Sequence, residues 1–374
     1  MNLFDDVKKQ VNNLFKTKNT YSIRGKRYTE EKLIAEGGFG YVYLVTDETG
    51  REFAMKKINV QDSSQQQMIK KEISYWSLIN KHPNIITLVD YELSSSQALI
   101  LMEFSRDGNL FNYITNELIE KNKTIKEEQA LEIFKQILSG VHHIHSKTSE
   151  GKPIQHRDIK IENVLIVNGG FKLCDFGSAS TETLDPSKVN KSTIKEQFSK
   201  YERTTTFMYR PPEMVDEYSG YPVSEKVDVW MLGCVLFALL YKEHPFANAQ
   251  RGTIINADYN FPFSGVFSEK IDDFIRLMLT QDPRNRPNTN DLLKIMSNWK
   301  SIVKIPLCDE TLDIKKKQLE TTDRDVYEKV NHSQPFSQDG SGFKPISADE
   351  LYKAQQSIMQ NQKGKKKYKK NDGM

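Results

Sequence analysis

Two short motifs constrain this chain more than any other stretch: HRDIKIEN at residues 156–163 and CDFG at residues 174–177. Between them lie two apolar runs of four residues, joined by the sequence NGG at residues 168–170, which is typical of a tight hairpin turn. A hairpin centred on this turn would bring Asn163 next to Asp175. The sequence therefore predicts that the polar ends of the two motifs meet in one place.

The side chains of these motifs suit phosphoryl transfer. Asp158 would accept the proton of an attacking hydroxyl, and Lys160 would steady the transferred phosphate. Asn163 and Asp175 offer oxygen ligands of the kind that Mg²⁺ prefers. An HRD tripeptide alone is weak evidence, but an Asn five residues after its Asp and a DFG twelve residues after that Asn form a specific combination. The alternative is an ion-paired loop beside a structural hairpin.

Residues 27–58 have the alternating pattern of antiparallel strands with a glycine-rich tip. Gly37, Gly38 and Gly40 have no Cβ atoms, so the backbone there can approach phosphates closely. The glycines lie between strands and no Walker sequence is present, which argues against a P-loop or Rossmann site. Lys56 on the next strand would reach the α- and β-phosphates of a nucleotide; the alternative is a solvated surface lysine.

A helix is expected over residues 65–80, because apolar residues recur there at steps of three and four. Glu72 lies at the edge of its apolar side and is the candidate partner of Lys56. The alternatives are a local pair with a neighbouring lysine, or solvation.

The apolar run 98–102 is expected to lead into a hinge. Backbone groups of Glu103 and Ser105 would read an adenine there, with Met102 behind it. Gly108 then marks a change from strand to helix pattern, which indicates a boundary between two lobes.

The second half of the chain has a helical pattern. Residues 127–145 form an amphipathic stretch that leads to HRD, and residues 226–241 are apolar on all sides except at Asp228. A buried Asp needs partners, and the backbone of the HRD loop is the expected one. Further on, Arg286 would pair with Glu213.

Composition bounds the classes of protein that fit. The chain has 374 residues, of which 37% are hydrophobic and 28% charged, as in a soluble globular protein. The last twelve residues hold six lysines and one Asp, and the rest of the chain has 47 basic and 49 acidic residues. A neutral body with one basic end argues against a nucleic-acid binder. Three cysteines without a pairing pattern indicate reduced thiols in a cytoplasmic protein.

Neither end of the chain carries a recognisable globular pattern. Residues 1–19 have apolar side chains at helical spacing, and such a helix would either pack on the domain or bind a membrane or partner. No secretory signal is expected, and the apolar run 229–241 is too short to span a bilayer. The lysine run at 363–370 would either contact an anionic membrane or remain solvated.

Together, these motifs resemble a eukaryotic protein kinase domain over residues 28–300. The phrases IAEGGFGYVYLV, ILMEF, HRDIKIENVL, KLCDFGSAS, TTTFMYRPPEM and EKVDVWMLGCVLF resemble the Numb-associated kinase family, which includes the adaptor-associated and cyclin-G-associated kinases. Two positions depart from the general kinase pattern. Ala35 replaces the first glycine, a change that itself resembles this family, and Pro211 stands where APE usually has Ala.

The resemblance implies an α+β class and a bilobal protein-kinase fold. A small antiparallel β-rich N-lobe with one main helix would cover residues 28–105, and a larger, mainly helical C-lobe residues 106–300. Residues 1–27 would be an N-terminal amphipathic extension, and residues 301–374 a partly disordered tail that ends in the lysine run. An extra helix is expected after the activation segment.

The resemblance also implies a serine/threonine kinase that uses ATP and Mg²⁺ on protein substrates. It links the chain to clathrin adaptors, to endocytic or actin traffic, and to a cytoplasmic location at endocytic membranes. A pseudokinase scaffold is the alternative, although none of the five residues whose loss would indicate one has been lost. The expected site residues are Asp158, Lys160, Lys56 and Glu72 for catalysis, Asn163 and Asp175 for the metal, and Ile34, Ala35, Glu36, Gly37, Gly38, Phe39, Gly40, Val42, Ala54, Lys56, Met102, Glu103, Ser105 and Leu165 for the nucleotide.

Arg157, next to Asp158, could link activity to phosphorylation of the chain. Kinases can use this arginine to hold a phosphorylated activation segment, and residues 175–213 contain many hydroxyl groups. Among them, Thr206 is expected to lie near Asp158 as a positioning group. The alternative to phosphate control is an Arg157 that pairs with an acidic residue of the segment and needs no phosphate.

Overall fold

A computed structural model describes the protein. Its chain divides into two compact units, residues 1–318 and residues 319–374, and the second lies almost wholly outside the described residues. The expected N-terminal helix, the tip residues Gly38 and Phe39, and the lysine run also lie outside them. The described residues are 18–37, 40–149, 151–262 and 266–319.

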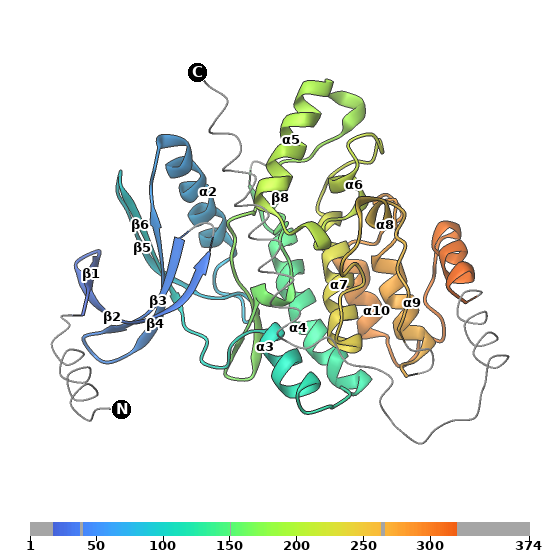
Figure 1. Ribbon diagram of the computed structural model, residues 1–374, viewed down its shortest axis with the longest axis horizontal. Coiled ribbons are helices and arrows are strands. Elements are labelled where there is room, and N and C mark those ends of the chain that lie inside the picture. Colours follow the sequence, from blue (N-terminus) through green and yellow to red (C-terminus); the bar gives the residue numbers. More distant parts are fainter. Residues whose placement is uncertain (1–17, 38–39, 150, 263–265, 320–374) are drawn as a thin grey trace, which may run out of the picture. The chain divides into compact units, whose positions relative to one another are not determined.

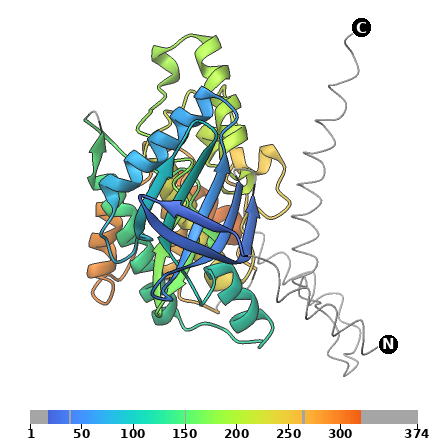
Figure 2. The ribbon, with the colours of Figure 1, turned by 90° about the vertical axis from the view of Figure 1, so that its left-hand side faces the viewer.

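Among the described residues, six strands form one antiparallel sheet in the order β1-β2-β3-β4-β6-β5. Figure 2 shows this sheet, coloured blue to teal, facing the viewer. One face of the sheet buries a small core that includes Val45, Met55 and Leu101. The edge strand β1 lies within residues that the sequence assigns to the N-terminal extension, so the sheet begins earlier than expected. The strands are β1 (Thr20–Ile23), β2 (Lys26–Gly37), β3 (Gly40–Asp47), β4 (Glu52–Asn59), β5 (Leu88–Leu93) and β6 (Gln97–Glu103).

One long helix, α2 (Ser63–Ile79), accompanies this sheet. Asp62 begins it by accepting a hydrogen bond from the backbone N–H of Gln65 at 2.7 Å, which satisfies one of the free donors of the first turn. Its buried face includes Ile73 and Trp76, and the Trp76 indole donates to the carbonyl of Ile86 at 2.9 Å. The helix expected over residues 65–80 is therefore confirmed, two residues longer at its start.

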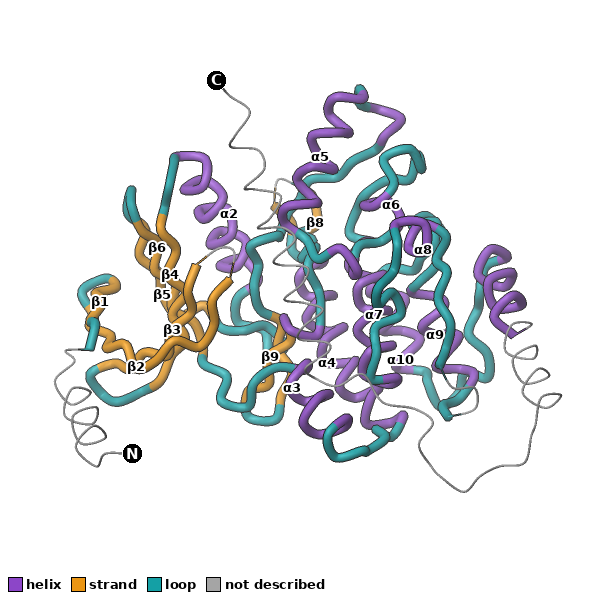
Figure 3. Tube along the Cα trace, in the orientation of Figure 1, coloured by secondary structure: helices purple, strands orange, loops and turns teal. Residues whose placement is uncertain are grey.

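The C-lobe is mainly helical, and Figure 3 shows its helices gathered apart from the sheet. Helix α7 is its centre, because every residue from Val227 to Tyr241 is buried, Asp228 included. This lobe and the sheet lobe confirm the predicted α+β, two-lobed class. The helices, labelled in Figure 1, are α3 (Leu110–Tyr113), α4 (Glu127–Ser146), α5 (Lys191–Thr204), α6 (Pro212–Val215), α7 (Lys226–Tyr241), α8 (Arg251–Ile255), α9 (Glu269–Met278) and α10 (Thr289–Ser297).

Two short hairpins belong to the same lobe. In β9 (Val164–Val167) and β10 (Gly170–Leu173), Val164 pairs with Leu173, as the sequence predicts. Asn168 and Gly169 between them have φ angles of 52° and 76°, the left-handed pair that a two-residue hairpin turn requires. The second hairpin, β7 (Thr148–Ser149) with β8 (Lys152–Pro153), precedes the HRD loop.

Ordered structure continues beyond residue 300. Residues 309–319 are helical, although the sequence assigns them to the partly disordered tail. Lys315 of this segment lies 2.9 Å from Asp273 and 2.6 Å from Glu269, both on α9. Its ammonium is largely buried, so these two carboxylates fix the segment against α9.

None of the helices in the described part of the chain has the length and apolar character needed to cross a membrane.

The expected pair of Arg286 with Glu213 is present and fully buried. The two guanidinium nitrogens lie 2.7 and 3.1 Å from the two carboxylate oxygens, and neither side chain is exposed to solvent. This bidentate contact joins α6 to the loop before α10.

Arg286→Met should lower the free energy of unfolding by about 3–5 kcal/mol, because it would leave the Glu213 carboxylate buried without a cation. Denaturant unfolding measures the change. Arg284→Met is the matched control, since the Arg284 side chain is 65% exposed and its pair with Asp282 should contribute less than about 1 kcal/mol. Equal losses in the two variants would contradict the structural role of Arg286.

Candidate active site

The ammonium of Lys56 on β4 is shared by two carboxylates. It lies 2.9 Å from Glu72 on α2 and 3.2 Å from Asp175, just after β10. Burial would lower the pKa of Lys56, but the charges of Glu72 and Asp175 outweigh it and raise that pKa. The same Lys56 charge lowers the pKa of Asp175. Lys56 thus forms the expected ion pair with Glu72 and a second one with Asp175.

Asp158 lies in a set of polar contacts. Its carboxylate accepts hydrogen bonds from the backbone N–H of Thr206 at 3.0 Å, from the Thr206 hydroxyl at 2.8 Å and from the Asn163 amide at 3.2 Å. Lys160 lies 2.8 Å from the same carboxylate and 2.9 Å from the Thr206 hydroxyl. Burial would lower the pKa of Lys160, but Asp158 raises it. Thr206 therefore lies where the sequence predicts.

The β9–β10 hairpin brings the two motifs together. The backbone N–H of Cys174 donates to the carbonyl of Asn163 at 3.0 Å, so Asn163 and Asp175 lie at the same end of the hairpin. Asp175 has a φ of 62°, an unfavourable backbone conformation that such sites use to aim a side chain. An amide oxygen and a partly exposed carboxylate are a donor set that fits a hard divalent cation. These two residues would hold it.

Asp228, at the start of α7, forms hydrogen bonds with the backbone of the catalytic loop. Its two carboxylate oxygens accept the backbone N–H groups of His156 at 2.7 Å and Arg157 at 2.8 Å, and His145 contacts it at 2.8 Å. Burial would raise the pKa of Asp228, but the contact with His145 and the donated hydrogen bonds lower it. Arg157 has a φ of 67°, so Asp228 holds a strained backbone. The expected partnership is confirmed.

Phe176 links the loop after Asp175 to α2. Its ring is fully buried, with its centroid 5.4 Å from Trp76 of α2 and 5.2 Å from His156 of the catalytic loop. The side chain next to Asp175 therefore packs on the helix that carries Glu72.

The glycine-rich hairpin lies next to Lys56. Gly37 pairs with Gly40, and Val42 lies between Ala35 of β2 and Lys56 of β4. Gly40 has a φ of 138°, and a Cβ atom there would lie 2.2 Å from the carbonyl oxygen of a β4 residue, so only glycine fits. Of the other residues expected here, Ile34 and Glu36 are exposed on β2, and Leu165 is half-buried on β9.

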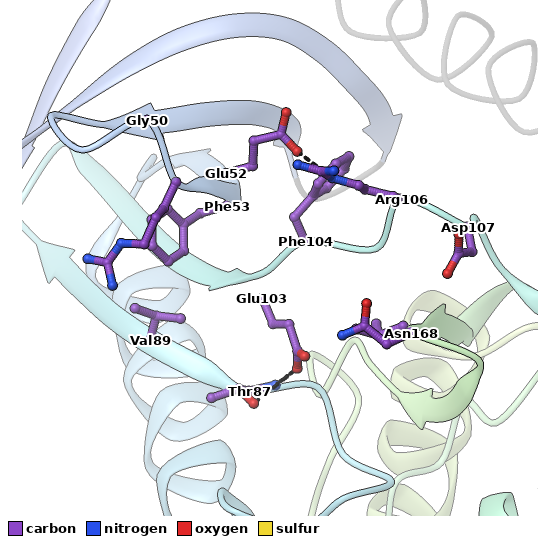
Figure 4. Close-up of a pocket in the computed structure, with 12 residues that line it drawn as sticks. Gly50, Glu52, Phe53, Thr87, Val89, Glu103, Phe104, Arg106, Asp107 and Asn168 are labelled. Atoms are coloured by element: carbon purple, nitrogen blue, oxygen red, sulfur yellow. Dashed lines mark hydrogen bonds and ion pairs between the residues drawn. The ribbon is translucent and has the colours of Figure 1, made fainter.

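The hinge follows β6. Ala54 of β4 pairs with Met102, so both lie next to the expected adenine site. The Glu103 carboxylate is engaged elsewhere: Lys172 donates to it at 2.7 Å and the Thr87 hydroxyl at 3.0 Å. Glu103 also lines a hollow of about 700 Å³. Figure 4 shows its side chain directed towards Thr87. The backbone N–H of Glu103 donates to the carbonyl of Thr87 at 3.0 Å, so neither its side chain nor its N–H is free for a nucleotide. The predicted recognition of adenine by the Glu103 backbone would therefore have to use the carbonyl.

Ser105, two residues along the hinge, is held in the same way. Its hydroxyl lies 2.7 Å from the carbonyl of Gly108 and 2.6 Å from that of Ile166. These bonds tie the hinge to β9, which leaves the Ser105 backbone for recognition. The ligand roles of all these residues stay predictions.

The extra helix of the activation segment is not where the sequence predicts it. This helix, α5, lies inside the segment, before Glu213, and not after it. Asn190 caps this helix, which buries Phe198 and Tyr201.

Arg157 contacts this segment without a phosphate. Its guanidinium donates to the backbone carbonyl of Glu182 and to the side-chain oxygen of Gln155, and it lies 5.7 Å from the Tyr201 ring. The acidic residue that the sequence allowed as a partner is therefore present, but it offers its carbonyl. Sequence reasoning missed Gln155, Glu182 and Tyr201 as partners of Arg157. Glu182 and Tyr201 are far from Arg157 in the sequence, so no local spacing links them to it.

This arrangement of a strand lysine, a helix glutamate, an HRD loop and a DFG hairpin agrees with the matches to known proteins. Residues 28–297 match the family model of the protein kinase domain. The chain belongs to the protein kinase family.

Relatives of this kinase-family chain carry matching names. A probable serine/threonine-protein kinase of Dictyostelium discoideum is 36% identical over 285 residues, covering 74% of this chain and 34% of that protein. A second from the same organism is 38% identical over 264 residues, covering 69% and 23%. Actin-regulating kinase 1 of Saccharomyces cerevisiae is 31% identical over 285 residues, covering 72% and 43%. The chain thus spans less than half the length of these curated relatives.

Asp175→Asn should weaken nucleotide binding in the presence of Mg²⁺ and change it little without Mg²⁺, because the amide is a poorer ligand for a hard cation than the carboxylate. Titration of ATP with and without Mg²⁺ measures the difference. Asp185→Asn, a solvent-exposed change ten residues along the same segment, is the control. A Mg²⁺ dependence equal to that of the wild type would contradict the assignment.

Proposed function

We propose that this chain is a serine/threonine protein kinase that transfers the γ-phosphate of MgATP to hydroxyl groups of protein substrates. The observation that carries the proposal is the Asp158 carboxylate, which lies 2.8 Å from Lys160 and shares a site with the Lys56–Glu72 pair. The kinase family and the names of the relatives support it.

The residues of the chain divide the chemistry among them. Lys56, oriented by Glu72, would bind the α- and β-phosphates. Asp158 would accept the proton of the substrate hydroxyl, while Thr206 and Asn163 hold its carboxylate in place. Mg²⁺, when bound at Asn163 and Asp175, supplies charge that offsets the phosphate oxygens.

Lys160, which forms an ion pair with Asp158, would bind the transferred phosphate. Its raised pKa keeps it cationic at neutral pH, so it would donate to the transferred phosphate.

The experiment that tests this proposal is transfer of labelled phosphate from ATP to mixed protein substrates, followed by identification of the phosphorylated amino acid. Label on serine or threonine supports the proposal. Nucleotide binding without transfer would favour the pseudokinase scaffold, and label on tyrosine would correct the substrate class.

Asp158→Asn should lower kcat by at least about a hundredfold and change MgATP affinity little, because the amide keeps the shape of the side chain but cannot accept the proton. Steady-state kinetics and nucleotide titration check the two parts. Transfer at close to the wild-type rate would contradict the role of Asp158 as the base.

Phosphate on the activation segment should not be needed for activity, because Arg157 already has polar partners and a ring contact there. Protein expressed in bacteria and treated with a phosphatase should keep kcat/KM within about twofold of the untreated protein. Loss of most activity, and its return after rephosphorylation, would contradict this prediction.

The cellular role proposed is regulation of actin or of clathrin-adaptor traffic at endocytic membranes, in the cytoplasm. It is supported by the resemblance to the Numb-associated kinases and by the name of the yeast relative. Identification of proteins that lose phosphate after acute inhibition would test it. A contact of the lysine run with anionic membranes is part of the same proposal, although that run lies outside the described residues.

A further inference from the structure

Glu182 lies where the catalytic loop, α2 and α5 meet. Its backbone carbonyl accepts hydrogen bonds from the Gln155 amide at 3.1 Å and from the Arg157 guanidinium. Its two carboxylate oxygens have different partners: one lies 3.2 Å from Lys71 on α2, and the other 2.5 Å from Lys200 on α5. A single residue of the activation segment thus contacts three separate elements.

A neighbouring contact reinforces the one to α2. The hydroxyls of Thr181 and Tyr75 lie 3.2 Å apart, and both side chains are buried. Lys71 and Tyr75 are four residues apart, so they lie on one face of α2. The activation segment therefore holds α2 at two successive turns of that face.

The same helix carries Glu72, whose direction depends on how α2 is turned. Consecutive residues on a helix point about 100° apart, so Glu72 faces Lys56 while Lys71 faces the activation segment. A helix turns as one body. Contacts on the face of Lys71 and Tyr75 therefore fix the direction of Glu72.

The charge needed for this bridge is present at neutral pH. Burial would raise the pKa of Glu182, but its contacts with Lys200 and Lys71 lower it to about 2. The side chains of Glu182, Lys71 and Lys200 are 38%, 47% and 36% exposed, so solvent screens these pairs and we expect them to contribute little to the stability of the fold.

We infer that Glu182 is a positioning residue, which couples the docking of α5 through Lys71 to the orientation of Glu72 towards Lys56. The inference rests on the proposed kinase function, because its consequence is a change in the rate of phosphate transfer. Helix α5 then serves catalysis without touching nucleotide or substrate.

The first test compares Glu182→Gln with Glu196→Gln in the full chain. Glu196→Gln is the matched control, since Glu196 is an exposed carboxylate on α5. Glu182→Gln should lower kcat/KM by about three- to tenfold, and the control should leave it unchanged. Equal kinetics for Glu182→Gln and the wild type would overturn the inference.

The second test asks whether Glu182 acts through Glu72. In a Glu72→Gln background, Glu182→Gln should cost less than about twofold, because the group that it positions is already lost. Losses that multiply in the double variant would show an independent structural role and overturn the inference.

A third test uses charge reversal and decides the question even if Glu182→Gln unfolds. Glu182→Lys should be nearly inactive. The triple variant Lys71→Glu/Glu182→Lys/Lys200→Glu restores both ion pairs and should recover at least about tenfold in kcat/KM over that single variant. No recovery would overturn the inference.

A readout without turnover separates this inference from the proposed function. Amide hydrogen exchange in α2 should be faster in Glu182→Gln than in the wild type and unchanged in Glu196→Gln. If the wild type transfers no phosphate, but α2 exchanges faster in Glu182→Gln than in the wild type, only the kinase proposal would be overturned. Identical exchange in all three proteins would overturn the coupling.

Discussion

The buried charge of Lys56 organises this protein, because a lysine side chain that is only 12% exposed requires carboxylates close to its ammonium group. One of them, Glu72, comes from α2, and the other, Asp175, follows the β9–β10 hairpin. Sheet, helix and hairpin must therefore converge on one atom. The apolar contact of Phe176 with Trp76 also holds the segment after β10 against α2.

Asp228 holds the catalytic loop in place by accepting hydrogen bonds from its backbone. It is fully buried at the centre of the C-lobe, and its oxygens are occupied by backbone N–H groups of the loop and by His145. The cost of an unpaired buried carboxylate makes this loop geometry the favourable one, even with Arg157 at a positive φ. Two buried charged groups thus hold two parts of the site in place: Lys56 holds the sheet, α2 and the hairpin together, and Asp228 holds the catalytic loop.

Much of this arrangement could be predicted from local pattern. The β9–β10 hairpin follows from its turn residues, α7 from an unbroken apolar stretch, and the pairing of Glu213 with Arg286 from the need to satisfy a buried charge. These features depend on residues close in sequence or on a group with few possible partners. The strand β1, which lies within residues 1–27, was not predicted, because a four-residue strand has little periodicity of its own.

The sequence by itself determined which groups gather at the candidate site, since the spacing of HRD, Asn and DFG and a lysine after a glycine-rich hairpin allow few other arrangements. Only the tertiary structure decided what holds those groups in place. Glu182 is 25 residues beyond Arg157, and its partners Lys71 and Lys200 are separated by much of the domain. Many charged side chains could have paired over such distances at similar free energy, and packing of α2 and α5 selects among them.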